Sequence, residues 1–89
     1  MPCCSPPHFR PAHIRYAVEK GKHIFAEKPV AVDAPGVRRV LESCREAKKK
    51  NLAVVSGLCY RYERSKQETM KRVHEGAVGD IVALHCNYN

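Results

Sequence analysis

The sequence predicts an α/β fold built from a parallel βαβ unit. Two apolar segments, residues 23–26 and 52–56, read as strands, and the segment between them has helical periodicity. Because the links between these segments are short, the strand, helix and strand should form one βαβ unit whose strands run parallel. A chain of 89 residues allows at most one small domain of this kind.

A first helix is predicted over residues 11–20, because Pro11 suits a first helical turn and Gly21 the position after the last one. Its apolar side chains recur on one face: Ile14, Ala17 and Val18. The strand at residues 23–26 follows. Pro29 stops this strand, since proline has no N–H to continue the hydrogen-bond ladder.

The second helix has the clearest apolar stripe of the chain. Asp33 is predicted as its N-cap, and Pro35 falls in its first turn. Apolar side chains then recur at helical spacing: Val37, Val40, Leu41, Cys44 and Ala47. Three lysines at positions 48–50 close the helix, where cations favour the negative end of its dipole. The continuously apolar residues 52–56 predict a strand buried on both faces.

The last third of the chain predicts one more helix and one more strand. Ser65 and Glu68 have the spacing of a capping box, and Gly76 is expected to end the helix that they begin. The residues expected to face inward on it are Met70 and Val73. Residues 81–88 show partial alternation and are predicted as a final strand.

Both ends of the chain are expected to be truncated. Cys3 and Cys4 resemble the last residues of a strand whose body is missing, and the strand at residues 81–88 has no partner behind it. A two-stranded parallel sheet with bare edges is not a stable unit. We therefore expect a fragment of a larger α/β protein.

Composition narrows the class of protein. Hydrophobic residues make up 44% and charged residues 28%, which is typical of a globular chain. The net charge of +7 fits either a solvated surface or an anionic partner, and composition alone favours the former. Five cysteines without a CxxC pair argue against a disulfide framework and a zinc knuckle, so no metal site is predicted. Cys44 and Cys59 are expected in the core.

The sequence offers no reason to expect a membrane partner. No apolar run is long enough to span a bilayer, and residues 1–11 lack the basic start and apolar centre of a signal peptide. A cytoplasmic location is therefore the default expectation, with export of the parent protein left open.

Several motifs together resemble one known family. Ser5-Pro6-Pro7, a helix, and then the segment GKHIFAEKP at residues 21–29 are similar to the Gfo/Idh/MocA family of NAD(P)-dependent oxidoreductases. Gly57 and the segment GAVGDI at residues 76–81 fit the same family. The resemblance implies a partial Rossmann domain. Residues 1–78 would be the C-terminal half of the dinucleotide-binding domain, and residues 79–89 the first strand of the substrate and oligomerisation domain.

The resemblance also implies a site. Lys28 would be the catalytic residue, lying beside the nicotinamide and moving the proton of the substrate hydroxyl while hydride leaves the same carbon. Glu27 would contact the nicotinamide ribose and orient the lysine, and Arg10 stands where many family members carry a histidine. The implied cofactor contacts are Ser5, Pro6, Arg10, Glu27, Lys28 and Pro29. Without the resemblance, Glu27 and Lys28 would read as a surface ion pair.

The function implied by the resemblance is hydride transfer between NAD or NADP and a hydroxyl carbon of a sugar, cyclitol or similar polyol, in a homo-oligomeric parent. The chain contains no GxGxxG motif to hold a pyrophosphate, so the isolated chain is expected to be inactive. One alternative is an inert truncated fragment. A less favoured alternative is a small basic nucleic-acid-binding protein, because residues 60–64 interleave tyrosines with arginines.

Overall fold

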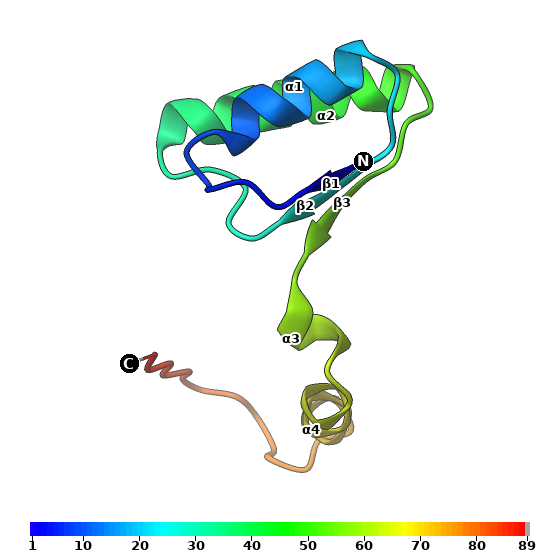
Figure 1. Ribbon diagram of the computed structural model, residues 1–89. Helices are drawn as coiled ribbons and strands as arrows, with labels where there is room; N and C mark the ends of the chain where they lie inside the picture. Colours follow the sequence, from blue (N-terminus) through cyan, green and yellow to red (C-terminus); the bar gives the residue numbers. More distant parts are fainter. Residues whose placement is uncertain (89) are drawn as a thin grey trace. The chain divides into compact units, whose positions relative to one another are not determined.

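The computed structural model describes residues 1–88, which form two compact units, Met1–Leu58 and the residues from Cys59 onward (Figure 1). The first unit contains β1 (Pro2–Cys3), α1 (Arg10–Glu19), β2 (Ile24–Glu27), α2 (Ala34–Lys49) and β3 (Val54–Gly57). The second unit contains α3 (Cys59–Tyr62) and α4 (Arg64–His74). The predicted α/β fold is therefore confirmed.

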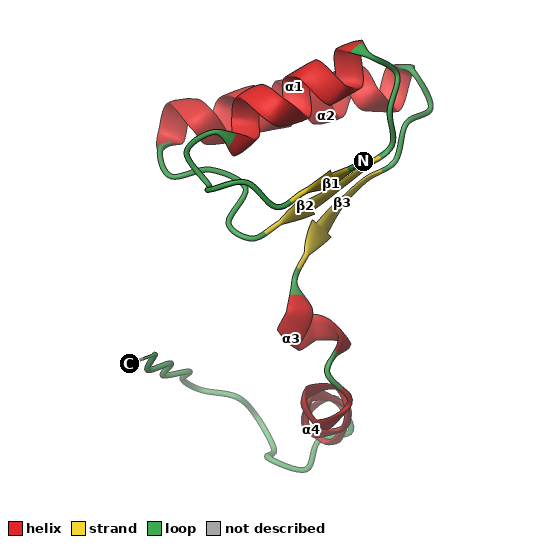
Figure 2. Ribbon diagram, viewed as in Figure 1, coloured by secondary structure: helices red, strands yellow, loops and turns green. Residues whose placement is uncertain are grey.

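The three strands of the first unit form one parallel sheet in the order β1-β2-β3. The central strand pairs on both sides, with Phe25 opposite Pro2 on β1 and opposite Val55 on β3. Both helices of this unit lie on the same face of the sheet (Figure 2). The predicted βαβ unit is confirmed by β2, α2 and β3, and β1 with α1 adds a second one.

The core of the first unit lies between this sheet face and the two helices. Ile14 and Val18 are its largest fully buried side chains. The other core residues are Cys3, Ala17, Ile24, Ala26, Val40 and Ala47. Asp33 caps α2 as predicted, since its carboxylate accepts a hydrogen bond of 2.6 Å from the backbone N–H of Gly36.

The inward face of α2 differs from the predicted stripe. Its buried residues are Gly36, Val40, Ser43 and Ala47. Val37 and Leu41, both predicted to be inside, are 43% and 52% exposed, and Cys44 is half-buried. The reason is the close contact at Gly36, where an added Cβ would lie 3.3 Å from Cγ of Pro11 on α1. Small residues face the first helix, which rotates the larger apolar ones to the flank.

The prediction that β3 is buried on both faces is also wrong. Val55 and its partner Phe25 are each 45% exposed, on the face of the sheet opposite the helices. No described helix of the first unit covers that face (Figure 2). A continuously apolar strand therefore does not by itself predict burial on both faces, because burial depends on which other elements pack against each face.

Helices α1 and α2 end in the same hydrogen-bonded turn. After α1, Gly21 has φ +66° and donates to Val18, while the N–H of Lys22 reaches Ala17. After α2, Asn51 has φ 54° and takes the equivalent position. These are Schellman motifs, which require a left-handed residue after the helix. Gly21 was predicted in this role and is confirmed, whereas Asn51 was not recognised.

Replacing Gly21 by alanine should lower the free energy of unfolding by about 1 kcal/mol, because a left-handed backbone costs a residue with Cβ roughly that much. The space around Gly21 is open, so no steric clash adds to the effect. Urea denaturation followed by circular dichroism measures the difference. Asn51→Gly places a glycine at the equivalent position after α2 and should raise the free energy of unfolding. A Gly21→Ala variant with the same free energy of unfolding as the unchanged chain would show that the left-handed backbone at Gly21 carries no cost.

The second unit departs from the sequence prediction in its details. Helix α4 begins after Glu63, and the hydroxyl of Ser65 donates to the Glu63 carboxylate at 2.6 Å, so the predicted Ser65–Glu68 capping box does not form. Gly76 follows the end of α4 with φ +86°, as predicted. Of the two residues expected inside, Val73 is half-buried, and Met70 is 49% exposed.

The strand predicted at residues 81–88 is wrong, because these residues have no regular secondary structure. The described part of the second unit contains no other strand with which they could pair. Cys59, predicted to lie in the core, is exposed at the start of α3. The predicted domain boundary after residue 78 stays a prediction, and Asn89 lies outside the described residues. No helix within residues 1–88 is long and apolar enough to cross a membrane.

Candidate functional site

The candidate site lies at the carboxyl edge of the parallel sheet. Because the three strands run in the same direction, the loops that follow β1 and β2 emerge at one edge, which is where open α/β sheets bind ligands. The first loop carries Ser5 and Pro6, and the second carries Lys28 and Pro29. All the residues implied by the sequence resemblance therefore lie in or beside these two loops.

Glu27 ends β2 with its carboxylate above the neighbouring strand. Its backbone pairs with Gly57 of β3. An added Cβ on Gly57 would lie 2.8 Å from Oε1 of Glu27, so only glycine leaves room for this carboxylate. Oε2 accepts a hydrogen bond of 3.2 Å from the backbone N–H of Lys28. Gly57 thus allows the half-buried position of Glu27, a role that its sequence gave no means to assign.

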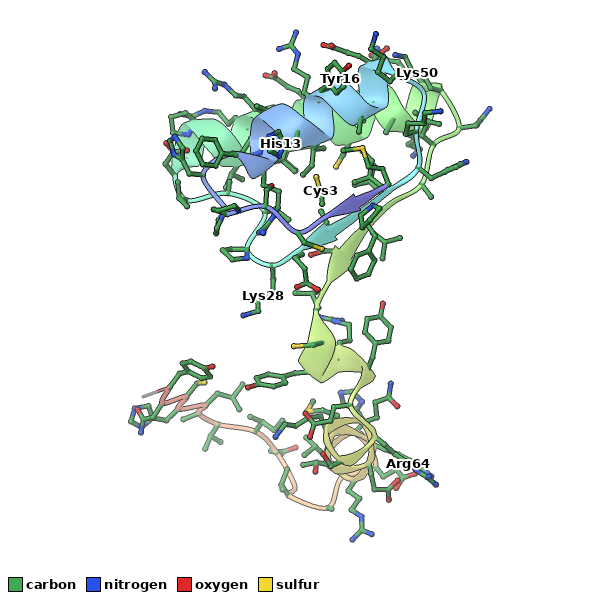
Figure 3. The ribbon with its side chains drawn as sticks, in the orientation of Figure 1. Cys3, His13, Tyr16, Lys28, Lys50 and Arg64 are labelled. Carbon is green, nitrogen blue, oxygen red and sulfur yellow. The ribbon has the colours of Figure 1, made fainter. Side chains whose placement is uncertain are left out.

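Lys28 presents its ammonium to solvent. Its side chain extends away from the sheet at the carboxyl edge (Figure 3), and the Lys28–Pro29 peptide bond is cis. Lys28 does not form the surface ion pair with Glu27. The four ion pairs within residues 1–88 all lie along α1, α2 and α4. Within these residues no acceptor is bonded to the Lys28 ammonium. This amine is free to interact with a ligand.

Arg10, the first residue of α1, is buried beneath the two loops. Its side chain is 3% exposed, and its guanidinium donates from Nη1 to the carbonyl of Pro29 and from Nη2 to the carbonyl of Ser5. Its Nε is buried without a partner among the described residues. The guanidinium predicted to contact a cofactor is thus bonded to the protein backbone of both loops.

The side chain of Ser5 is held by a residue that sequence reasoning left without a role. The Ser5 hydroxyl lies 2.9 Å from Nδ1 of His13, which is one turn along α1 from Arg10. The ring of Phe9 stacks on the His13 imidazole, with centroids 6.3 Å apart. Pro6, next to Ser5, is exposed at the rim of the same loop. Helix α1 therefore fixes the first loop through both its backbone and its hydroxyl.

Replacing Gly57 by alanine should move the Glu27 carboxylate away from Lys28 while leaving the fold intact. The group in the way is the end of a flexible side chain, so the free energy of unfolding should change by less than about 0.5 kcal/mol. The backbone N–H of Lys28 would lose its acceptor, and its NMR signal should shift. Ser56→Ala, one residue earlier in β3, is the control. An unmoved Lys28 amide in Gly57→Ala would show that Gly57 does not position Glu27.

Comparison with known proteins gives consistent matches. The family model described as an oxidoreductase family with an NAD-binding Rossmann fold, Gfo/Idh/MocA, matches residues 3–56. Inositol 2-dehydrogenase 3 of Saccharopolyspora erythraea is 34% identical over 74 residues, which are 83% of this chain and 21% of that protein. The chain thus spans about a fifth of the length of the curated relatives it matches.

Solved structures give the same picture. The crystal structure of myo-inositol 2-dehydrogenase from Lactobacillus plantarum matches with a TM-score of 0.84 and 28% identity, over 91% of this chain and 23% of that one. Scyllo-inositol dehydrogenase from Lactobacillus casei, solved with bound NAD(H) and scyllo-inositol, matches with a TM-score of 0.73 and 28% identity, over 86% of this chain and 22% of that one. The Rossmann type of fold predicted from the sequence is confirmed by these matches.

Proposed function

This chain belongs to the Gfo/Idh/MocA family of oxidoreductases with an NAD-binding Rossmann fold, and from that premise we propose that it forms the nicotinamide side of a site for hydride transfer. The reaction proposed is the oxidation of a polyol hydroxyl, or its reverse, with NAD or NADP as the hydride carrier. Inositol is the substrate named for several relatives, and it is the first candidate here.

The observation that carries this proposal is the unpaired Lys28 ammonium at the carboxyl edge of β2, one residue after Glu27. The donor set fits a nicotinamide ribose and a substrate hydroxyl. Glu27 has one carboxylate oxygen on the Lys28 backbone, and Oε1 has no hydrogen bond within the described residues, so it can accept one from a ribose hydroxyl. Ser5 and Pro6 lie in the neighbouring loop and would line the same edge.

When bound, NAD(P) supplies the hydride acceptor for the substrate carbon. The residues of this chain would bind the substrate hydroxyl and transfer its proton. In its neutral amine form, Nζ of Lys28 accepts a hydrogen bond from the substrate hydroxyl and takes its proton as the hydride leaves. The ammonium that results returns the proton to solvent, to which the side chain is open. Glu27 keeps the lysine backbone in place through its hydrogen bond to the N–H of that residue.

In this function the chain would contact only the nicotinamide end of the dinucleotide. No GxGxxG motif for a pyrophosphate occurs in its 89 residues. We therefore propose that the chain alone does not turn over substrate.

Titration of the isotope-labelled chain with NAD⁺ and NADP⁺, followed by NMR, tests the proposal. The expected result is a shift of the backbone amides of Ser5, Glu27 and Lys28, at millimolar concentrations, with no oxidation of added myo-inositol. A single-stranded oligonucleotide is titrated in parallel. Binding of the oligonucleotide that weakens steeply with salt, without any response to dinucleotide, would replace this proposal with nucleic-acid binding. No response to any of the probes would indicate an inert fragment.

A further inference from the structure

Arg10 is the feature of the site that its proposed chemistry does not use. Within residues 1–88 it is the only charged side chain that is buried, at 3% exposure. Removing a charge from water is costly unless hydrogen bonds compensate it. The compensation here comes from two backbone carbonyls, those of Ser5 and Pro29.

These two carbonyls belong to different loops. Ser5 follows β1, Pro29 follows β2, and the residues are 24 positions apart in the sequence. Neither carbonyl has another hydrogen-bond donor within the described residues. The guanidinium of Arg10 is thus a direct link between the loop of the cofactor-lining residues and the loop of Lys28. A planar fork with several donors can make such a bridge, whereas a lysine ammonium is a single point of charge.

We propose that Arg10 is a positioning residue that fixes the distance between the Ser5 loop and the Lys28–Pro29 loop. It acts through the two backbone carbonyls, to which its buried guanidinium donates. The inference deepens the proposed function and rests on it for its catalytic meaning. His13 supports the same arrangement, because it holds the Ser5 side chain from the same helix.

The bridge predicts that the two loops lose their order together. Each loop is anchored at one end by its strand, so removing the link should loosen both loops without unfolding the sheet. Hydrogen bonds from a charged donor are stronger than those between neutral groups. Loss of the bridge should therefore raise the rate of amide hydrogen exchange in both loops by about tenfold or more.

The first measurement needs no variant. In the wild-type chain with ¹⁵N-labelled arginine, the Nη protons of Arg10 should exchange slowly with water and give separate signals, because the side chain is buried and both nitrogens donate to backbone carbonyls. The Nη protons of Arg15 on the same helix are the internal comparison, since that side chain is 66% exposed. Fast exchange and averaged Nη signals for Arg10 would overturn the proposal, even if every Arg10 variant failed to fold.

The second measurement compares Arg10→Lys and Arg10→Met with the control Arg15→Lys. Amide exchange should quicken in the loops around Ser5 and Pro29 in both Arg10 variants, and in neither loop of the control. NAD⁺ titrations of the same samples should show weaker shifts at Ser5 and Lys28 together. Loosening of one loop without the other would contradict the bridge. If NAD⁺ shifts nothing in the wild-type chain, the proposed function fails, and the exchange rates still decide whether Arg10 couples the loops.

Discussion

Replacing Lys28 by methionine should lower the rate of the proposed polyol oxidation by about 10²- to 10⁴-fold, which is the usual contribution of a positioned acid or base. Methionine keeps an unbranched stem and removes only the amine. Lys28 is exposed, and its ammonium has no partner within the described residues, so the free energy of unfolding should hardly change. The rate is measured in a polypeptide of family length that contains this chain.

Lys22→Met is the matched control for this experiment. Lys22 is also exposed, and it lies six positions before Lys28, ahead of β2 rather than after it. Its replacement should leave the rate within about twofold of the unchanged protein, because surface substitutions away from a site have small effects. A Lys28→Met enzyme that retains most of its rate would show that the proton leaves by another route.

Replacing Ile14 by alanine should lower the free energy of unfolding of the first unit by about 2–5 kcal/mol. Ile14 is fully buried at 0% exposure and lies on the inner face of α1, so its removal leaves a cavity beneath the helix. Small domains have only about 5–15 kcal/mol of stability in total. The loss is measured from urea denaturation of the chain, monitored by circular dichroism.

Leu41→Ala provides the contrast, since it removes an apolar side chain of the same size from the exposed flank of α2. Its effect should stay within about 0.5 kcal/mol. If Leu41→Ala cost as much as Ile14→Ala, the outward position of Leu41 would be wrong, and the inner face of α2 would be the stripe that the sequence predicted.

The structural features that could be predicted from the sequence are those that depend on residues close together in the chain. Asp33 and Gly21 are a cap and a helix end whose chemistry acts within four residues, and both are confirmed. The rotation of α2 could not be predicted in the same way, because Gly36 and Ser43 are not apolar and do not enter a hydrophobic stripe. Their inward position depends on the close approach of α1, which is a contact between distant parts of the sequence.

The site shows the same division. The resemblance identified the residues of the two loops, yet it gave no role to Gly57, whose function is to leave space for a side chain on the adjacent strand. The burial of Arg10, in contrast, could have been predicted from the helical periodicity of the sequence. Arg10 precedes Ile14 and Ala17 by four and seven positions, so it lies on the inner face of α1, where a charged residue must find buried partners.

The face of the sheet opposite α1 and α2 bears two half-exposed apolar side chains, which should influence how molecules of this chain associate in solution. Phe25 and Val55 offer an apolar surface to any neighbouring molecule, while a net charge of +7 keeps identical molecules apart. That repulsion reaches about 30 Å at 0.01 M salt and only about 3 Å at 1 M. Samples should therefore remain dispersed in dilute buffer and become turbid as salt is added, so low ionic strength is the condition for preparing and storing the protein.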